Sequence, residues 1–296
     1  MKVGEILSQD VIIVKKKSQA RVIWNRFTKN KVAVIGLVIL CAVIIFTYGA
    51  NLFFSYEDAI KQNLSIKLNK PSFAHPFGTD YYGRDLLTRV AFGGRISISV
   101  SVAVTFLTLA VSLIIGAASA YWGGIIDSIN MRVSDMFMAI PPILMAITIV
   151  AVLGPNLFNL LLALAISSIP STVRMVRSLI LTIKNNEYIE AAHACGTSNI
   201  MIIFKHLIPN IMGVTIVSAT LGLAGIILSI SALGFLGLGA QPPTPEWGLI
   251  LSEGRGQIRY NPYLVFFPGM ATVITVLALN LVGDGLRDAL DPRMKN

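Results

Sequence analysis

Residues 187–209 read EYIEAAHACGTSNIMIIFKHLIP, a polar and amphipathic stretch between two long apolar runs. The side chains that follow Glu190 are small, so another surface could approach the backbone closely there. Gly196 is suited to the left-handed conformation that ends a helix. Thr197 or Ser198 could then accept hydrogen bonds from the free N–H groups of a following helix. The stretch therefore predicts two short helices joined by a sharp turn.

The second of these helices carries an apolar stripe on one face. Its members recur at intervals of three and four residues: Ile200, Ile203, Phe204 and Leu207. Pro209 would close this helix and serve as the first residue of the apolar run that follows. An ordinary loop between membrane spans explains these features as well as a docking surface does, so the residues alone leave both interpretations open.

The composition of the 296-residue chain is that of an integral membrane protein. Hydrophobic residues make up 54% of it and charged residues only 13%, which is typical of proteins with several membrane spans. The net charge of +9 could suggest a nucleic-acid partner. The basic residues instead cluster beside apolar runs, so no nucleic-acid binding is expected. Cys41 and Cys195 lie in unrelated segments, and no disulfide is predicted.

Six apolar segments are long enough to cross, or nearly cross, the hydrocarbon layer. They cover residues 32–49, 96–121, 131–153, 157–173, 211–233 and 263–282. The third contains Pro141 and Pro142, which a membrane helix can accommodate as a kink. Two thirds of the 24 Lys and Arg residues fall on one side of this arrangement. The excess predicts that both termini are cytoplasmic, with the first helix retained rather than cleaved.

The predicted organisation follows from these spans. It consists of a basic cytoplasmic tail (1–31), a first transmembrane helix (32–50), an external loop (51–94), a five-helix core (95–286) that contains the loop 187–209, and a cytoplasmic C-terminal tail (287–296).

Two further strings are predicted to be external. In HPFGTDYYGRD, residues 75–85, Thr79 or Asp80 could cap a turn, while Arg84 and Asp85 could bind each other or a partner. A solvated turn explains this string equally well. The second string is GFLGLGAQPPTPEWG, residues 234–248. Its prolines and Trp247 suit an external loop seated partly at the membrane interface, with the aromatic ring at headgroup depth.

Four strings together resemble one protein family. Glu190-Ala191-Ala192, Gly196 and the Ile-Pro pair at 208–209 resemble the EAA loop of permease subunits in binding-protein-dependent ABC importers. His206 and Ile208 depart mildly from the usual pattern of that loop. The strings at 75–85, 234–248 and 284–293 resemble the dipeptide, oligopeptide and nickel branch of the same family. The resemblance covers roughly residues 75–293.

This resemblance implies an all-α integral membrane protein with six transmembrane helices, the type I ABC importer permease fold and a cytoplasmic coupling-helix loop. The expected partners are a homologous permease in a heterodimer, two cytoplasmic ABC ATPase subunits, an extracytoplasmic substrate-binding protein and the lipid bilayer. The expected location is a bacterial or archaeal cell membrane. Di- or oligopeptides are the expected cargo, with nickel or another metal complex as the alternative.

The resemblance also assigns roles to individual residues. The expected ATPase-coupling residues are Glu190, Ala191, Ala192, Gly196, Ile200, Ile203, Phe204, Leu207 and Pro209. The expected contacts to an external partner are Asp80, Arg84, Asp85, Glu246 and Trp247.

The sequence lacks several residue patterns that would indicate nucleotide binding, metal binding or ion-coupled transport. There is no GxxxxGK[ST] loop to hold a nucleotide phosphate, so the chain is not expected to be an enzyme, and ATP and Mg²⁺ would belong to partner subunits. The histidines at 75, 193 and 206 lack metal-ligand spacing, and no metal site is predicted. A self-sufficient secondary transporter would be expected to carry carboxylates near mid-span. Mid-span positions here are almost free of charge, which favours the importer permease.

Overall fold

The computed structural model describes residues 19–290, and these residues form helices, turns and loops without a β-strand. Within this range the α-helices are α1 (Gln19–Lys29), α2 (Lys31–Gly49), α3 (Tyr56–Ile60), α4 (Leu86–Trp122), α5 (Gly124–Met138), α6 (Pro142–Leu153), α7 (Leu157–Leu181), α8 (Glu187–Ala194), α9 (Asn199–Ile202), α10 (Ile208–Phe235), α11 (Trp247–Gly254) and α12 (Tyr263–Leu290). A π-helical turn, Ile203–Leu207, joins α9 to α10. The predicted tail segments 1–18 and 291–296 lie outside the described residues.

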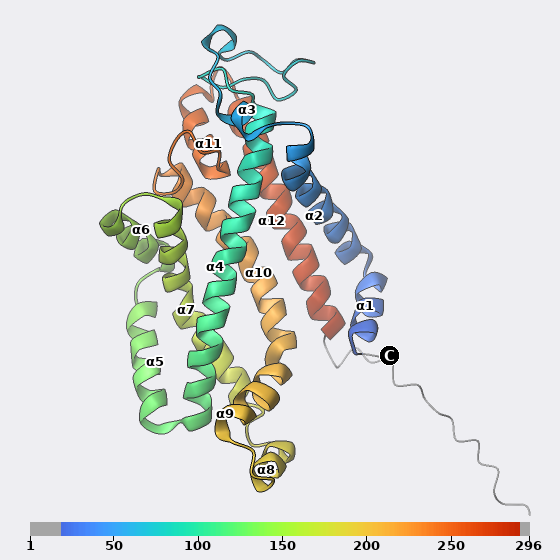
Figure 1. Ribbon diagram of the computed structural model, residues 1–296, viewed down its shortest axis with the longest axis vertical. Coiled ribbons are helices and arrows are strands. Elements are labelled where there is room, and N and C mark those ends of the chain that lie inside the picture. The colour runs from blue at the N-terminus through green and yellow to red at the C-terminus, as the bar shows by residue number, and fades with distance from the viewer. Residues whose placement is uncertain (1–18, 291–296) are drawn as a thin grey trace, which may run out of the picture.

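The long helices run side by side along the axis of an elongated bundle (Figure 1). Five helical stretches are long and apolar enough to span a membrane: α2, α4, α7, the continuous α9–α10 stretch and α12. The pair α5 and α6 passes the same test together, with a bend of 85° between its halves, and makes a sixth crossing if it counts as one span. The all-helical membrane class is therefore confirmed.

The predicted bounds differ from the structure at three places. Helix α4 begins at Leu86, well before the predicted 96, because the Asp85 carboxylate caps it by accepting a 2.9 Å hydrogen bond from the Thr88 N–H. The residues between the predicted spans 96–121 and 131–153 are mostly helix rather than a turn, since α5 starts at Gly124. The predicted basic tail 1–31 also contains α1, whose Phe27 is buried against α12.

The second predicted helix of 187–209 does not end at Pro209. The helical stretch runs without a break from Asn199 to Phe235. Pro209 has no N–H to donate to the carbonyl four residues earlier, and the turn before it widens into the π-helical segment. The amphipathic stretch is therefore the projecting end of a membrane span rather than a separate short helix.

Three of the apolar clusters among the described residues follow one another along the bundle. The first lies near α11 and includes Leu86, Ile227 and Trp247. The second lies in the middle, between α4, α7 and α10. The third lies at the α8 end and joins α4 and α7 to the 187–209 stretch. These clusters fix a polar segment at each end of the bundle, and the two segments are the candidate sites.

Candidate functional site

The coupling segment, residues 187–209, lies at one end of the bundle beneath α4 and α7 (Figure 1). Helix α8 ends at a left-handed Gly196 with φ of +76°, as the sequence predicts. The Gly196 N–H donates to the His193 carbonyl at 2.9 Å, and the Thr197 N–H donates to the Ala192 carbonyl at 3.1 Å. Ser198 occupies the N-cap position of α9, but its side chain makes no cap hydrogen bond, so that prediction is wrong.

The predicted apolar stripe is divided between core and surface. Ile203 and Leu207 are buried against the chain's own α4 and α7, together with Ile202, which the stripe did not include. Ile200 is 63% exposed and Phe204 is 59% exposed. The division arises because this segment continues into a membrane span and must bury one face against its neighbours. Ile203 and Leu207 therefore support the segment from inside.

The outward side of the segment forms what we call the coupling face. It consists of exposed residues from α8, the turn and the start of the α9–α10 helix: Glu190, Ala191, Gly196, Ile200 and Phe204. Ala192 is half-buried behind it, and Pro209 is exposed farther along the helix. The face thus contains both small residues and an exposed aromatic ring.

Tyr121, at the end of α4, holds the coupling segment in place. Its hydroxyl donates to the Asn199 Oδ1 atom at 2.8 Å and lies 3.2 Å from the His193 Nε2 atom. The Lys184 ammonium group also donates to the carbonyl of Ala120 at 3.0 Å. Sequence reasoning missed these contacts, because they join residues more than 60 positions apart and no local pattern marks them. A displacement of the segment would reach α4 directly.

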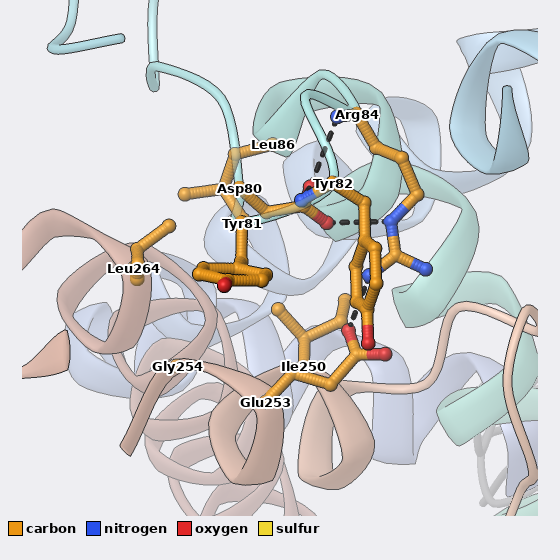
Figure 2. Close-up of a pocket in the computed structure, with 9 residues that line it drawn as sticks. All are labelled: Asp80, Tyr81, Tyr82, Arg84, Leu86, Ile250, Glu253, Gly254 and Leu264. Carbon is orange, nitrogen blue, oxygen red and sulfur yellow. Dashed lines mark hydrogen bonds and ion pairs between the residues drawn. The ribbon is translucent and has the colours of Figure 1, made fainter. Parts of the chain in front are cut away.

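A cluster of four charged side chains, the outer charge cluster, lies at the other end of the bundle, beside α11 and the start of α4. It comprises Asp80, Arg84, Arg89 and Glu253. Figure 2 shows three of its members, Asp80, Arg84 and Glu253. Asp80 caps the turn, as predicted, by accepting hydrogen bonds from the N–H groups of Tyr82 and Arg84 at 2.8 and 2.9 Å. Its other oxygen accepts from the Arg84 Nε atom at 2.6 Å. The cluster thus fixes the shape of the loop that precedes α4.

Glu253 brings the two arginines together. Its Oε2 atom accepts hydrogen bonds from Arg84 and Arg89, at 2.8 and 2.7 Å. Both arginines are at most 1% exposed, and two acidic groups balance their charge. Arg84 does not pair with Asp85, which instead caps α4 and lies 2.8 Å from the His75 Nδ1 atom. The predicted Arg84–Asp85 pair is therefore wrong, and the cluster joins the outer loop to α4 and α11.

The Glu246 side chain caps α11 from a fully buried position. Its oxygens accept hydrogen bonds from the N–H groups of Gly248 and Leu249, at 2.8 and 2.9 Å, and from the Ser97 hydroxyl at 2.9 Å. Burial raises the pKa of the Glu246 carboxyl, and these three hydrogen bonds oppose that rise. The carboxyl group therefore stabilises the start of α11 and its contact with α4.

Trp247 is fully buried next to this carboxyl, and its indole N–H donates to the Val90 carbonyl at 2.8 Å. The ring is therefore enclosed by the chain's own residues rather than facing lipid headgroups, and its depth in the membrane stays a prediction. Two glycines without side chains allow Glu246 and Trp247 to pack this closely against α4 and α10. A Cβ on Gly94 would lie 2.5 Å from the Trp247 ring, and a Cβ on Gly234 would lie 2.4 Å from a Glu246 oxygen. The glycine-rich string and the Glu-Trp pair form one packing unit.

This geometry leaves the residues expected to contact an external partner little exposed surface, and those contacts stay a prediction. Asp80, Arg84, Glu246 and Trp247 are all buried within the chain, where their polar atoms bind its own groups. Asp85 is partly exposed, but its carboxylate is engaged by α4 and His75. The adjoining cavity in Figure 2 holds only about 120 Å³. These residues hold the outer loop and α11 against α4.

Residues 92–296 match the family of the binding-protein-dependent transport system inner membrane component. Residues 18–71 match the N-terminal TM domain of oligopeptide transport permease C. The dipeptide transport system permease protein DppC of Alkalihalophilus pseudofirmus is 45% identical, over 92% of this chain and 90% of its own. The oligopeptide transport system permease protein OppC of Haemophilus influenzae is 41% identical, over 93% and 90%. The glutathione transport system permease protein GsiD of Escherichia coli is 40% identical, over 92% and 90%.

A solved structure shares the fold. It is the inward-facing MetNI methionine ABC transporter, which is 22% identical to this chain with a TM-score of 0.55. The match covers 68% of this chain and 96% of the other. At that identity the likeness concerns the fold alone, and it agrees with the all-helical architecture described above.

Proposed function

The chain belongs to the binding-protein-dependent transport system inner membrane components, and from this membership we propose that it forms half of an importer's pathway for di- or oligopeptides. It is a multi-pass permease subunit of the ABC class. The cargo proposal rests on its relatives, which are named for dipeptides, oligopeptides and glutathione, itself a tripeptide. A nickel or other metal complex is the alternative cargo.

We propose that the coupling face is the docking site for a cytoplasmic ATPase. The observation that carries this role is that an aromatic side chain, Phe204, is 59% exposed on a segment that also exposes small residues and is tethered to α4. ATP and Mg²⁺ would be held by two such ATPase subunits, since the sequence lacks a phosphate-binding loop. The remaining partners are a homologous permease in a heterodimer and a substrate-binding protein at the opposite end.

The proposed orientation puts the coupling segment in the cytoplasm of a bacterial or archaeal cell. Both termini would lie on that side. Figure 1 supports this arrangement, because α1 and the last turn of α12 lie toward the same end of the bundle as α8. The basic residues that flank the spans at this end agree with the positive-inside distribution.

The test is to reconstitute the chain with its permease, ATPase and binding-protein partners in lipid vesicles. We expect ATP hydrolysis to rise with binding protein loaded with tri-alanine, and not with binding protein exposed to Ni²⁺–histidine. The permease chain alone is expected to hydrolyse no ATP. Stimulation by the nickel complex but not by tri-alanine would replace the peptide proposal. Specific labelling of the isolated chain by a photoreactive ATP analogue would contradict the proposed division of roles.

A further inference from the structure

The two halves of the coupling segment are attached to the bundle unequally. The half that follows Gly196 buries Ile202, Ile203 and Leu207 against α4 and α7. Helix α8, all of which the structure describes, buries only Ile189. Apart from its own chain neighbours, a Cβ added to Gly196 would meet no atom of the described residues within 4 Å. Helix α8 therefore needs a further contact if its movement is to reach the bundle.

Tyr121 supplies such a contact from the last turn of α4. Its hydroxyl lies 3.2 Å from the Nε2 atom of His193, in the last turn of α8. The same hydroxyl donates at 2.8 Å to the Oδ1 atom of Asn199, the first residue of α9. The Tyr121 ring also stacks on the His193 ring, with centroids 6.1 Å apart and planes 16° apart. One side chain of α4 thus contacts both sides of the turn at Gly196.

The hydroxyl group can bind both neighbours at once. It has one hydrogen to donate and lone pairs with which to accept. Because Tyr121 donates its hydrogen to Asn199, a hydrogen bond with His193 requires the histidine to donate from Nε2. A phenylalanine would keep the ring contact but lose both hydrogen bonds. The apolar cluster beneath the segment would remain, so loss of the hydroxyl should loosen α8 without detaching the segment.

We propose that Tyr121 is the positioning residue that makes α4 follow the movement of α8. The proposal rests on the ATPase docking role given above and assigns the contact that carries movement from the docked segment into a membrane span. Without the hydroxyl, the ATPase stays bound and hydrolyses ATP, but α4 follows it in fewer cycles. The quantity that Tyr121 controls is therefore the amount of cargo moved for each ATP hydrolysed.

The experiment measures ATP hydrolysis and cargo uptake together, by the complete transporter in lipid vesicles. The cargo is radiolabelled tri-alanine or Ni²⁺–histidine, whichever stimulates hydrolysis by the wild type. For Tyr121→Phe we expect uptake per ATP to fall about threefold, because hydrogen bonds of this kind shift a population only modestly. The melting temperature and the amount of co-purified ATPase should match the wild type, since the apolar cluster is unchanged.

A double-mutant cycle tests whether the hydroxyl acts through its partner on α9. Asn199→Ala removes the acceptor of the 2.8 Å hydrogen bond and should also lower uptake per ATP. Tyr121→Phe combined with Asn199→Ala should give the same ratio as Tyr121→Phe alone, because both changes remove that one hydrogen bond. Multiplied reductions in the double variant would show that the two residues act separately and would contradict the proposal.

Two matched controls leave the coupling segment untouched. Tyr48→Phe removes another tyrosine hydroxyl, which lies 2.7 Å from the Ser99 hydroxyl between α2 and α4. Ser119→Ala removes a 2.8 Å hydrogen bond from Asn130 of α5, two residues before Tyr121 on α4. The first control matches the chemistry of the change and the second matches its place. Both should keep the wild-type uptake per ATP.

Three results would overturn the inference. They are a wild-type ratio in Tyr121→Phe, an equal fall in the two controls, and loss of bound ATPase from a stable Tyr121→Phe variant. In the last case the hydroxyl would shape the docking surface rather than transmit movement. Failure of the proposed function looks different, because the wild type itself would then take up neither cargo, or Phe204→Ser would keep its bound ATPase.

Discussion

The two ends of the bundle contrast in how they use polar strings that look alike in the sequence. At the α8 end, Glu190 and Phe204 face outward, while the turn between them is built by backbone hydrogen bonds. At the α11 end, Arg84, Glu246 and Trp247 are buried and bind groups on other helices. The first end is thus a surface available to a partner. The second end holds the chain's own elements together.

The difference shows that a polar loop motif does not by itself mark an interaction surface. Buried charge is tolerated at the α11 end because acidic and basic groups are paired there, although the Nε and Nη1 atoms of Arg89 and the Oε1 atom of Glu253 have no hydrogen-bond partner among the described residues. Removing one member should therefore damage the fold, whereas removing an exposed member at the α8 end should damage only the contact with a partner. Substitutions at the two ends can break or sharpen this contrast.

The largest effect is expected for Glu253→Gln in the outer charge cluster. The change leaves the buried guanidinium groups of Arg84 and Arg89 with Asp80 as their only nearby carboxylate among the described residues. Loss of one partner from a buried charge group should lower stability by about 3 kcal/mol. The loss of stability is measured by thermal unfolding of the detergent-purified wild type and variant. Glu57→Gln, at an exposed position of the outer loop, is the control, and equal melting temperatures in both variants would contradict the structural role.

A smaller and more local effect is expected for Gly196→Val in the coupling segment. A β-branched residue at φ of +76° should strain the turn by roughly 1–3 kcal/mol. Gly196→Asn should be tolerated, because asparagine adopts this conformation more readily. We expect faster hydrogen exchange in α8 and reduced peptide uptake for the valine variant, with the melting temperature of the bundle unchanged. Uptake at the wild-type level in both variants would leave the segment as a simple connector.

The smallest effect concerns the pH dependence contributed by Glu246. Because burial raises the pKa of this carboxyl in the fold, its contribution to stability is complete below its ordinary pKa and is lost as pH rises through the raised value. Glu246→Gln cannot titrate. The melting temperature of the variant relative to wild type should therefore increase between about pH 5 and about pH 8. A difference that is constant across this range would show that the Glu246 carboxyl does not titrate differently in the fold.

Much of the fold could be predicted from the sequence because lipid imposes simple rules. The lengths of the apolar segments predicted the membrane spans, and Gly196 predicted the turn that follows α8. The bounds were less accurate, because polar first turns such as that of α4 are capped by a neighbouring side chain rather than marked by hydropathy. Pro209 indicated the end of a helix, yet it lies in the first turn of α10 after a π-helical turn.

The role of each site residue was harder to predict. Whether Arg84 is exposed depends on Glu253, which lies 169 positions later in the chain. The burial of Glu246 likewise depends on Ser97, 149 positions earlier. Contacts between residues so far apart in the chain leave no local periodicity or motif from which they could be predicted. On the coupling segment, 3.6-residue spacing placed Ile200 with Ile203, but only the latter reaches the core once the helix joins α10.

The most direct test of the contrast between the two ends compares Phe204→Ser with Glu253→Gln in the same assembled transporter. For each variant, the melting temperature and the amount of ATPase that co-purifies with the folded permease are measured. We predict that Phe204→Ser keeps the wild-type melting temperature but loses most of the bound ATPase, whereas Glu253→Gln melts earlier and its folded fraction still binds ATPase. Undiminished ATPase binding by a stable Phe204→Ser variant would contradict the account.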